Sequence, residues 1–215
     1  SIADTLINGI FGRVTGDAGS RFVIAIGQAI FLVLFLILYG DCIAARQRIG
    51  AVYFFSRISN RKKWILKEFV WLLFYSVLYT FCFVGMHMIF SIWGSSEADL
   101  SGTLFKVAFQ IGLFLTLLLF EMAVLCNLFC AAGGSAIGIL LSMLCVIGLI
   151  MWSTAEVDGV VSEMINPMWL SADIIENGGS YIQKIIIVFL QTAICAVGTG
   201  YYLAKRDLFA REGEG

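Results

Sequence analysis

The chain alternates long uncharged stretches with short polar ones. Five apolar stretches are long enough to cross a hydrocarbon core of about 30 Å as helices. They cover residues 22–40, 64–93, 104–131, 135–153 and 183–203. A segment in lipid must satisfy its own backbone hydrogen bonds, and these stretches lack the short alternation of barrel strands. The pattern therefore predicts an all-α polytopic membrane protein with five visible transmembrane helices.

The composition supports this class. Hydrophobic residues make up 60% of the chain and charged residues 13%, whereas soluble domains carry about 25% charged residues. We therefore expect the chain to reside in a lipid bilayer and to bind no nucleic acid. A bacterial cytoplasmic membrane is the expected location.

The charges predict which loops face the cytosol. The stretch from Asp41 to Lys67 holds seven of the fourteen Lys and Arg residues, whereas the loop at 154–182 holds five acids and no basic residue. The positive-inside rule puts the first in the cytosol and the second outside. An alternating path then puts residues 1–20 outside or at the interface. We therefore expect a first helix before Ser1, which would give six spans.

The residues around the basic stretch resemble the permease subunits of type-2 ABC exporters. The likeness is carried by Tyr39-Gly40, by Arg46 to Gly50, by the run from Phe54 to Arg61 and by Lys67 at the next helix. It implies a six-helix permease fold in which residues 21–215 hold five of the helices, with a coupling segment at 41–63. It also implies that the outer loop at 154–182 forms two short re-entrant helices around Asn166 and Pro167.

The resemblance further implies partners and a function. The expected partners are ABC ATP-binding subunits and a second permease chain, in a homodimer or a heterodimer. The ATPase-docking residues would be Arg46, Gly50, Tyr53, Phe54, Arg57, Ser59 and Arg61. No G-x-x-x-x-G-K-[ST] motif occurs in the chain, so ATP and Mg would be bound by the partner. The complex would export a peptide, drug or lipid-like substrate, with no catalytic residue in this chain.

Polar residues inside the spans are candidates for a translocation path or a subunit interface. Glu121 is the most informative, because a carboxylate inside a span costs about 2.5–3.5 kcal/mol on insertion scales. It either ties helices together or lines a path or interface. The other candidates are Gln28, His87, Gln110 and Gln191. They form either one polar layer, since each lies about six to eight residues from the outer end of its predicted span, or separate interhelical hydrogen bonds.

Two other functions compete with export. An intramembrane enzyme would use Glu121 and His87 as acid and base, and a sensor or assembly subunit would transport nothing. The six cysteines lie in or beside spans, so a disulfide framework is not expected. Cys126 and Cys130 share a helix face, but two thiolates without further ligands do not make a zinc site, so no metal site is predicted.

Overall fold

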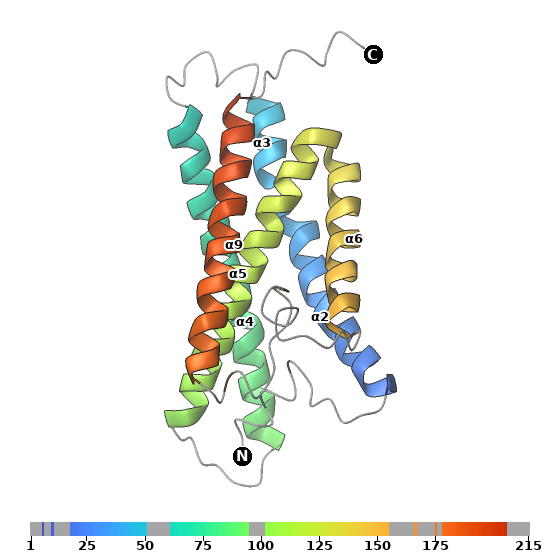
Figure 1. Cartoon of the computed structure of the whole chain (residues 1–215), viewed down its shortest axis with the longest axis vertical. Helices are drawn as coiled ribbons and strands as arrows, with labels where there is room; N and C mark the ends of the chain where they lie inside the picture. The colour runs from blue at the N-terminus through green and yellow to red at the C-terminus, as the bar shows by residue number, and fades with distance from the viewer. Residues whose placement is uncertain are drawn as a thin grey trace.

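The protein is a bundle of long helices (Figure 1). The computed structural model describes Leu6, Ile10, residues 18–50, 61–94 and 102–154, Asn166, Ile175 and residues 178–205. Its helices are α2 (Ala18–Tyr39), α3 (Cys42–Gly50), α4 (Arg61–Gly94), α5 (Gly102–Gly133), α6 (Ser135–Thr154) and α9 (Gly178–Lys205). No strand occurs among these residues, which confirms the all-α class.

Five helical stretches are long and apolar enough to cross a membrane. They are Ile26–Arg48, Arg61–Trp93, Leu104–Gly133, Ser135–Trp152 and Gly178–Lys205. The prediction of five visible spans is confirmed, and the first stretch continues from α2 into α3. The predicted segment at 1–20, apart from Leu6, Ile10 and residues 18–20, lies outside the described part of the chain. So do residues 51–60 and, apart from Asn166 and Ile175, the proposed re-entrant helices.

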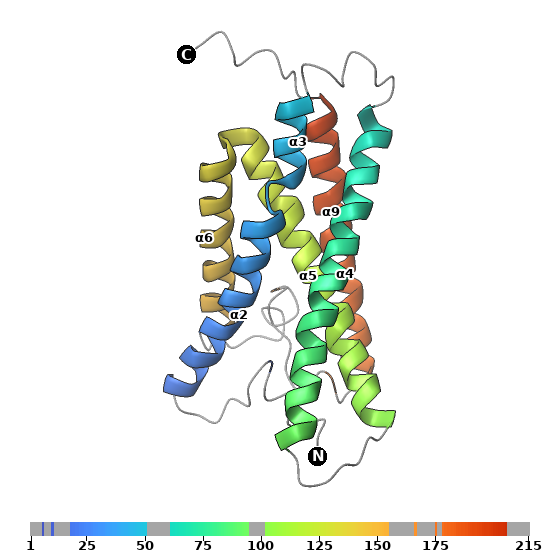
Figure 2. The same cartoon turned by 180° about the vertical axis from the view of Figure 1, so that it is seen from behind.

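Helix α5 is the centre of the bundle. In the most apolar 18 residues of α5, 67% of the residues are buried inside the protein, against 22–33% in the corresponding stretches of the other four spans. It crosses obliquely from the side of α4 and α9 to the side of α2 and α6, as both side views show (Figures 1 and 2). The other spans therefore share α5 as a packing partner and present most of their remaining surface outward.

A tight turn joins α5 to α6. Gly134 has a φ of 93°, a left-handed conformation that favours glycine. A Cβ on Gly138 would lie 2.3 Å from the backbone nitrogen of Cys130, so the two helices approach more closely than any side chain at this position would allow. The turn falls in the gap at 132–134 between two predicted spans, and the small residue at 138 lets the two helices pack closely.

Helices α2 and α4 meet through aromatic rings. We call this contact the aromatic seam, and it consists of Phe31, Phe35 and Tyr39 on α2 with Tyr75, Tyr79 and Phe83 on α4. Ring centroids across it are 4.1 Å apart for Phe31 and Phe83 and 4.8 Å apart for Tyr39 and Tyr75. One polar contact crosses it, from the Tyr79 hydroxyl to the Phe31 carbonyl at 3.2 Å.

Most of the described basic residues lie at one end of the bundle, which we call the basic end and where α3, the start of α4 and the end of α9 lie (Figure 1). They are Arg46, Arg48, Arg61, Lys62, Lys63, Lys67 and Lys205. Lys106 and Lys184 lie near the opposite ends of their helices. Helix α4 has 34 residues, about 51 Å at helical rise, so its basic first turns extend beyond a hydrocarbon core of about 30 Å.

Candidate functional site: a short helix tied to three spans

Helix α3 follows α2 after a sharp corner at Gly40 and Asp41. The Gly40 amide donates to the Leu36 carbonyl at 2.8 Å, and the Asp41 carbonyl accepts from the Ala45 amide at 2.7 Å. A Cβ on Gly40 would lie 2.3 Å from the Leu36 oxygen and 2.7 Å from Cys126 Sγ. The corner therefore needs glycine, because α2 and α5 leave no space for a side chain there.

Asn127 of α5 caps the first turn of α3. Its side chain is fully buried, and Oδ1 accepts hydrogen bonds from the Ile43 amide at 2.9 Å and the Ala44 amide at 3.1 Å. Its Nδ2 donates to the Ala123 carbonyl at 2.8 Å. The first amides of a helix have no intrahelical acceptor, and a cap is usually a residue of the same helix. Here the cap comes from another span, so the start of α3 is fixed to the central helix.

An ion pair joins α3 to α4. Arg46 Nη1 lies 2.5 Å from Glu68 Oε2, and the side chain of Glu68 is 8% exposed whereas that of Arg46 is 50% exposed. The guanidinium therefore supplies the counter-charge for a carboxylate that is largely removed from water. Arg46 was a predicted ATPase-docking residue, and within this chain it is already engaged with Glu68.

A polar chain joins α3 and the preceding corner to α6. Arg48 donates through Nη2 to the hydroxyl of Ser135, the first residue of α6. The Ser135 hydroxyl in turn donates to Asp41 Oδ2 at 2.8 Å, and Arg48 Nη2 lies 4.0 Å from that same oxygen. The Ser135 hydroxyl thus bridges Arg48 and Asp41.

The remaining predicted docking residues are placed only in part. Gly50 is the last residue of α3, and Arg61 is the first residue of α4. Tyr53, Phe54, Arg57 and Ser59 lie outside the described residues. The segment that the resemblance assigns to docking is thus bounded by α3 on one side and by the basic first turn of α4 on the other.

Glu121 connects α5 with α9. The residue is 5% exposed, and its carboxyl contacts Thr192 Oγ1 at 3.3 Å and Cys195 Sγ at 3.9 Å. The Thr192 hydroxyl also lies 2.8 Å from the Val188 carbonyl. Since this carboxyl faces a neighbouring helix rather than lipid, the geometry favours its interpretation as a tie between helices.

The structure does not bring the predicted polar layer together. The Tyr181 hydroxyl donates to the Gln110 carbonyl at 2.9 Å, which fixes the depth of Gln110 against α9. Gln191 lies ten residues further along α9, about 15 Å at helical rise. The two glutamines are therefore at different depths. Counting from position 183 puts Gln191 too near the outer end of its span, because α9 begins at Gly178. Gln28 of α2 is half-buried.

His87 and Glu121 are also far apart along the bundle. Phe69 of α4 meets Phe120 of α5 edge to face, with ring centroids 6.3 Å apart, so Phe69 marks the depth of Glu121 on α4. His87 lies eighteen residues beyond Phe69, about 27 Å at helical rise. Its ring packs at 4.5 Å against Phe83 of the same helix. An acid–base pair of Glu121 and His87 does not fit this arrangement.

A second polar junction lies at the end opposite the basic end. Asn166 is 1% exposed, and its Nδ2 donates to the Leu149 carbonyl of α6 at 3.0 Å. Lys184 of α9 is 2% exposed, and its Nζ donates to the carbonyl of Asn166. Asn166 thus links α6 with α9. Its predicted neighbour in this loop, Pro167, lies outside the described residues.

The cysteine pair packs inside the α5–α6 hairpin. Cys126 Sγ and Cys130 Sγ are 3.9 Å apart, and the latter lies 3.7 Å from the Ser135 carbonyl. Among the described residues, no group of three or more His, Cys, Asp and Glu side chains could hold a metal ion. Both cysteines are buried in this hairpin.

Asn127, Glu68 and Lys184 are among the residues of these junctions that sequence reasoning missed. Each carried a signal, because each is a polar or charged residue within a predicted span. Comparisons with known proteins add no family: no family model, no curated protein and no solved structure matches this chain.

Proposed function

We propose that this chain is the permease subunit of an ATP-driven exporter of the type-2 ABC class. A separate subunit would hydrolyse ATP, and the cargo would be a peptide, a drug or a lipid-like molecule leaving the cytosol. The observation that supports this proposal best is the attachment of α3. A short helix at the basic end is joined by directional contacts to α4, α5 and α6.

These attachments suit a helix that receives a push from a motor protein. An ATPase subunit that moves α3 would move the Asn127 cap on α5, the Glu68 carboxylate on α4 and the Ser135 hydroxyl on α6 together. The spans would then tilt as connected bodies and open a path towards the outside. One hydrogen bond crosses the aromatic seam between α2 and α4, so few directional contacts would oppose such a tilt there.

Charge reversal at the docking residues tests the proposal. The double variant Arg57→Glu and Arg61→Glu should lose co-purification with the cognate ATPase subunit. A basic segment is expected to dock on an acidic surface, and the new glutamates would be repelled by that surface. The matched control is Lys106→Glu, an exposed lysine on α5 at the opposite end. Retained ATPase binding by the double variant, together with intact folding, would contradict the docking assignment.

Transport assays separate export from the competing functions. In vesicles that contain the permease and ATPase subunits, a true cargo should stimulate ATP hydrolysis and accumulate on the far side of the membrane. A sensor or assembly subunit would show neither effect. If Glu121 lines the path, Glu121→Gln should lower transport while leaving thermal stability unchanged. The distance between Glu121 and His87 gives no support to an intramembrane enzyme built on this pair.

A further inference from the structure

Lys67 stands at the end of an apolar face of α4. Residues spaced by seven lie on nearly the same side of a helix, and the residues seven and fourteen positions after Lys67 are Phe74 and Phe81. These two residues are 53% and 76% exposed, so this apolar side of α4 faces outward from the bundle. Lys67 is itself exposed, and Lys63 lies one turn nearer the basic end on the same face. Lys67 therefore lies at the level expected for lipid headgroups, and the apolar face lies at the level of the acyl chains.

Helix α9 repeats this arrangement at the same end. Lys205 Nζ lies 4.4 Å from the centroid of the Tyr201 ring, a cation–π contact. Tyr201 is 61% exposed, and Val197, one turn further from the basic end, is 74% exposed. A lysine again lies above a lipid-facing stripe, with an aromatic ring at the boundary between them.

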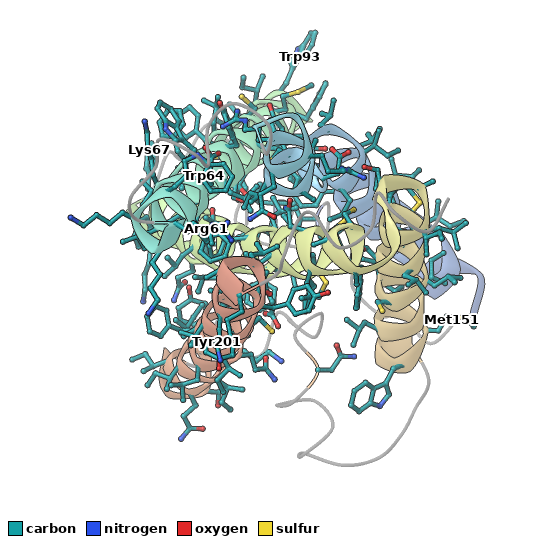
Figure 3. The ribbon with its side chains drawn as sticks, turned by 90° about the horizontal axis from the view of Figure 1, so that it is seen from above. Arg61, Trp64, Lys67, Trp93, Met151 and Tyr201 are labelled. Atoms are coloured by element: carbon teal, nitrogen blue, oxygen red, sulfur yellow. The ribbon has the colours of Figure 1, made fainter. Side chains whose placement is uncertain are left out.

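The two lysine-capped faces are adjacent. A Cβ on Gly200 of α9 would lie 3.3 Å from Cε2 of Phe69 on α4, so the helices touch near the basic end. Viewed from that end, Lys67 and Tyr201 lie on one side of the bundle, and Met151 of α6 lies on the other (Figure 3). The cationic side chains of α4 and α9 thus border one lipid-exposed surface.

We propose that this surface binds anionic phospholipid. Lys63, Lys67 and Lys205 would hold headgroup phosphates, and the acyl chains would lie along Phe74, Phe81 and Val197. A net negative headgroup is required because a zwitterionic one offers the amines no net charge, and each Lys or Arg near a membrane surface strengthens binding to anionic lipid about fivefold. This inference is independent of the proposed export function.

The experiment is a lipid titration of the purified chain in detergent. Native mass spectrometry counts bound short-chain phosphatidylglycerol and, in a parallel series, short-chain phosphatidylcholine. We expect phosphatidylglycerol to bind preferentially. Each of Lys63→Gln, Lys67→Gln and Lys205→Gln should weaken its binding about fivefold, and the triple variant about a hundredfold. Equal binding of the two lipids, or unchanged binding by the triple variant, would overturn the proposal.

Matched variants keep the result interpretable. Lys106→Gln removes an exposed lysine from the opposite end and should leave binding unchanged. Replacing the three lysines with arginine keeps the charge and should preserve binding. If the triple glutamine variant does not fold, the three single variants decide the question. Binding of inorganic phosphate as tight as that of phosphatidylglycerol would indicate a free-anion site. Loss of ATPase association with unchanged lipid binding would assign the lysines to a protein contact. Either result overturns the lipid assignment.

Discussion

The attachment of α3 and the aromatic seam join helices by different means. Around α3, the contacts are hydrogen bonds and ion pairs. Some join buried groups, such as Asn127 and the Ile43 amide, and others have one half-exposed partner, such as Arg46 with Glu68. Across the seam, α2 and α4 meet through ring faces and edges with one hydrogen bond. Hydrogen bonds require a narrow range of distances and angles, whereas aromatic pairs are favourable over centroid separations of about 4.5–7 Å. The first region should transmit motion, and the second should permit it.

The largest effect is expected at the cap of α3. Asn127→Leu keeps the side-chain size but leaves the Ile43 and Ala44 amides without their acceptor. A buried donor without a partner costs about 1–3 kcal/mol, so we expect a loss of about 3 kcal/mol in the free energy of unfolding. Denaturant unfolding in micelles measures it. Asn127→Asp keeps the acceptor oxygens and should lose less. Equal stability of Asn127→Leu and the wild type would disprove the cap.

A smaller loss, of about 2 kcal/mol, is expected for Gly40→Ala. The new Cβ would overlap the Leu36 carbonyl oxygen and Cys126 Sγ, so the corner between α2 and α3 must shift and strain the packing. Gly27→Ala is the control, because a Cβ on that glycine of α2 meets nothing within 4 Å. It should be neutral or stabilise the helix by about 0.5–1 kcal/mol. The melting temperature should therefore fall for Gly40→Ala and stay the same or rise for Gly27→Ala.

The ion pair between α3 and α4 should respond asymmetrically to substitution. Arg46→Met leaves the largely buried Glu68 carboxylate without its cation, whereas Glu68→Gln leaves a half-exposed arginine that water can solvate. We expect Arg46→Met to cost about 1–2 kcal/mol and Glu68→Gln less than half of that. The double variant should be more stable than Arg46→Met alone. If Glu68→Gln proves the more costly single change in the same unfolding assay, the proposed asymmetry between the buried carboxylate and the exposed guanidinium is wrong.

The spans could be predicted because their signal is local. A run of apolar residues is visible in the chain, and backbone hydrogen bonding in lipid turns such a run into a helix. The tight α5–α6 turn could also be predicted, because Gly133 and Gly134 interrupt an otherwise apolar pattern. Helix ends were less exact: α9 begins five residues before position 183, since its first turns face protein through Tyr181 and Lys184.

The partners of polar residues could not be predicted, because they depend on which spans meet and at what depth. Asn127 and Ile43 are 84 positions apart, and nothing in the local sequence relates them. The same limit explains the polar layer: distance from a predicted span end did not give the depth of Gln110 relative to Gln191. These contacts do not test the family resemblance, which stays a prediction.

The smallest effect is expected in the aromatic seam. Tyr79→Phe removes the hydrogen bond to the Phe31 carbonyl but keeps the ring that packs 5.1 Å from Phe31 and 5.2 Å from Phe35. Interhelical hydrogen bonds in membranes contribute about 0.6 kcal/mol on average, so the unfolding free energy should fall by no more than about that amount. Tyr79→Ala, which removes the ring, should cost several times more because the packing against both phenylalanines is lost. If Tyr79→Phe were as damaging as Tyr79→Ala, a directional bond would hold α2 against α4. The contrast between a fixed α3 and a sliding seam would then fail.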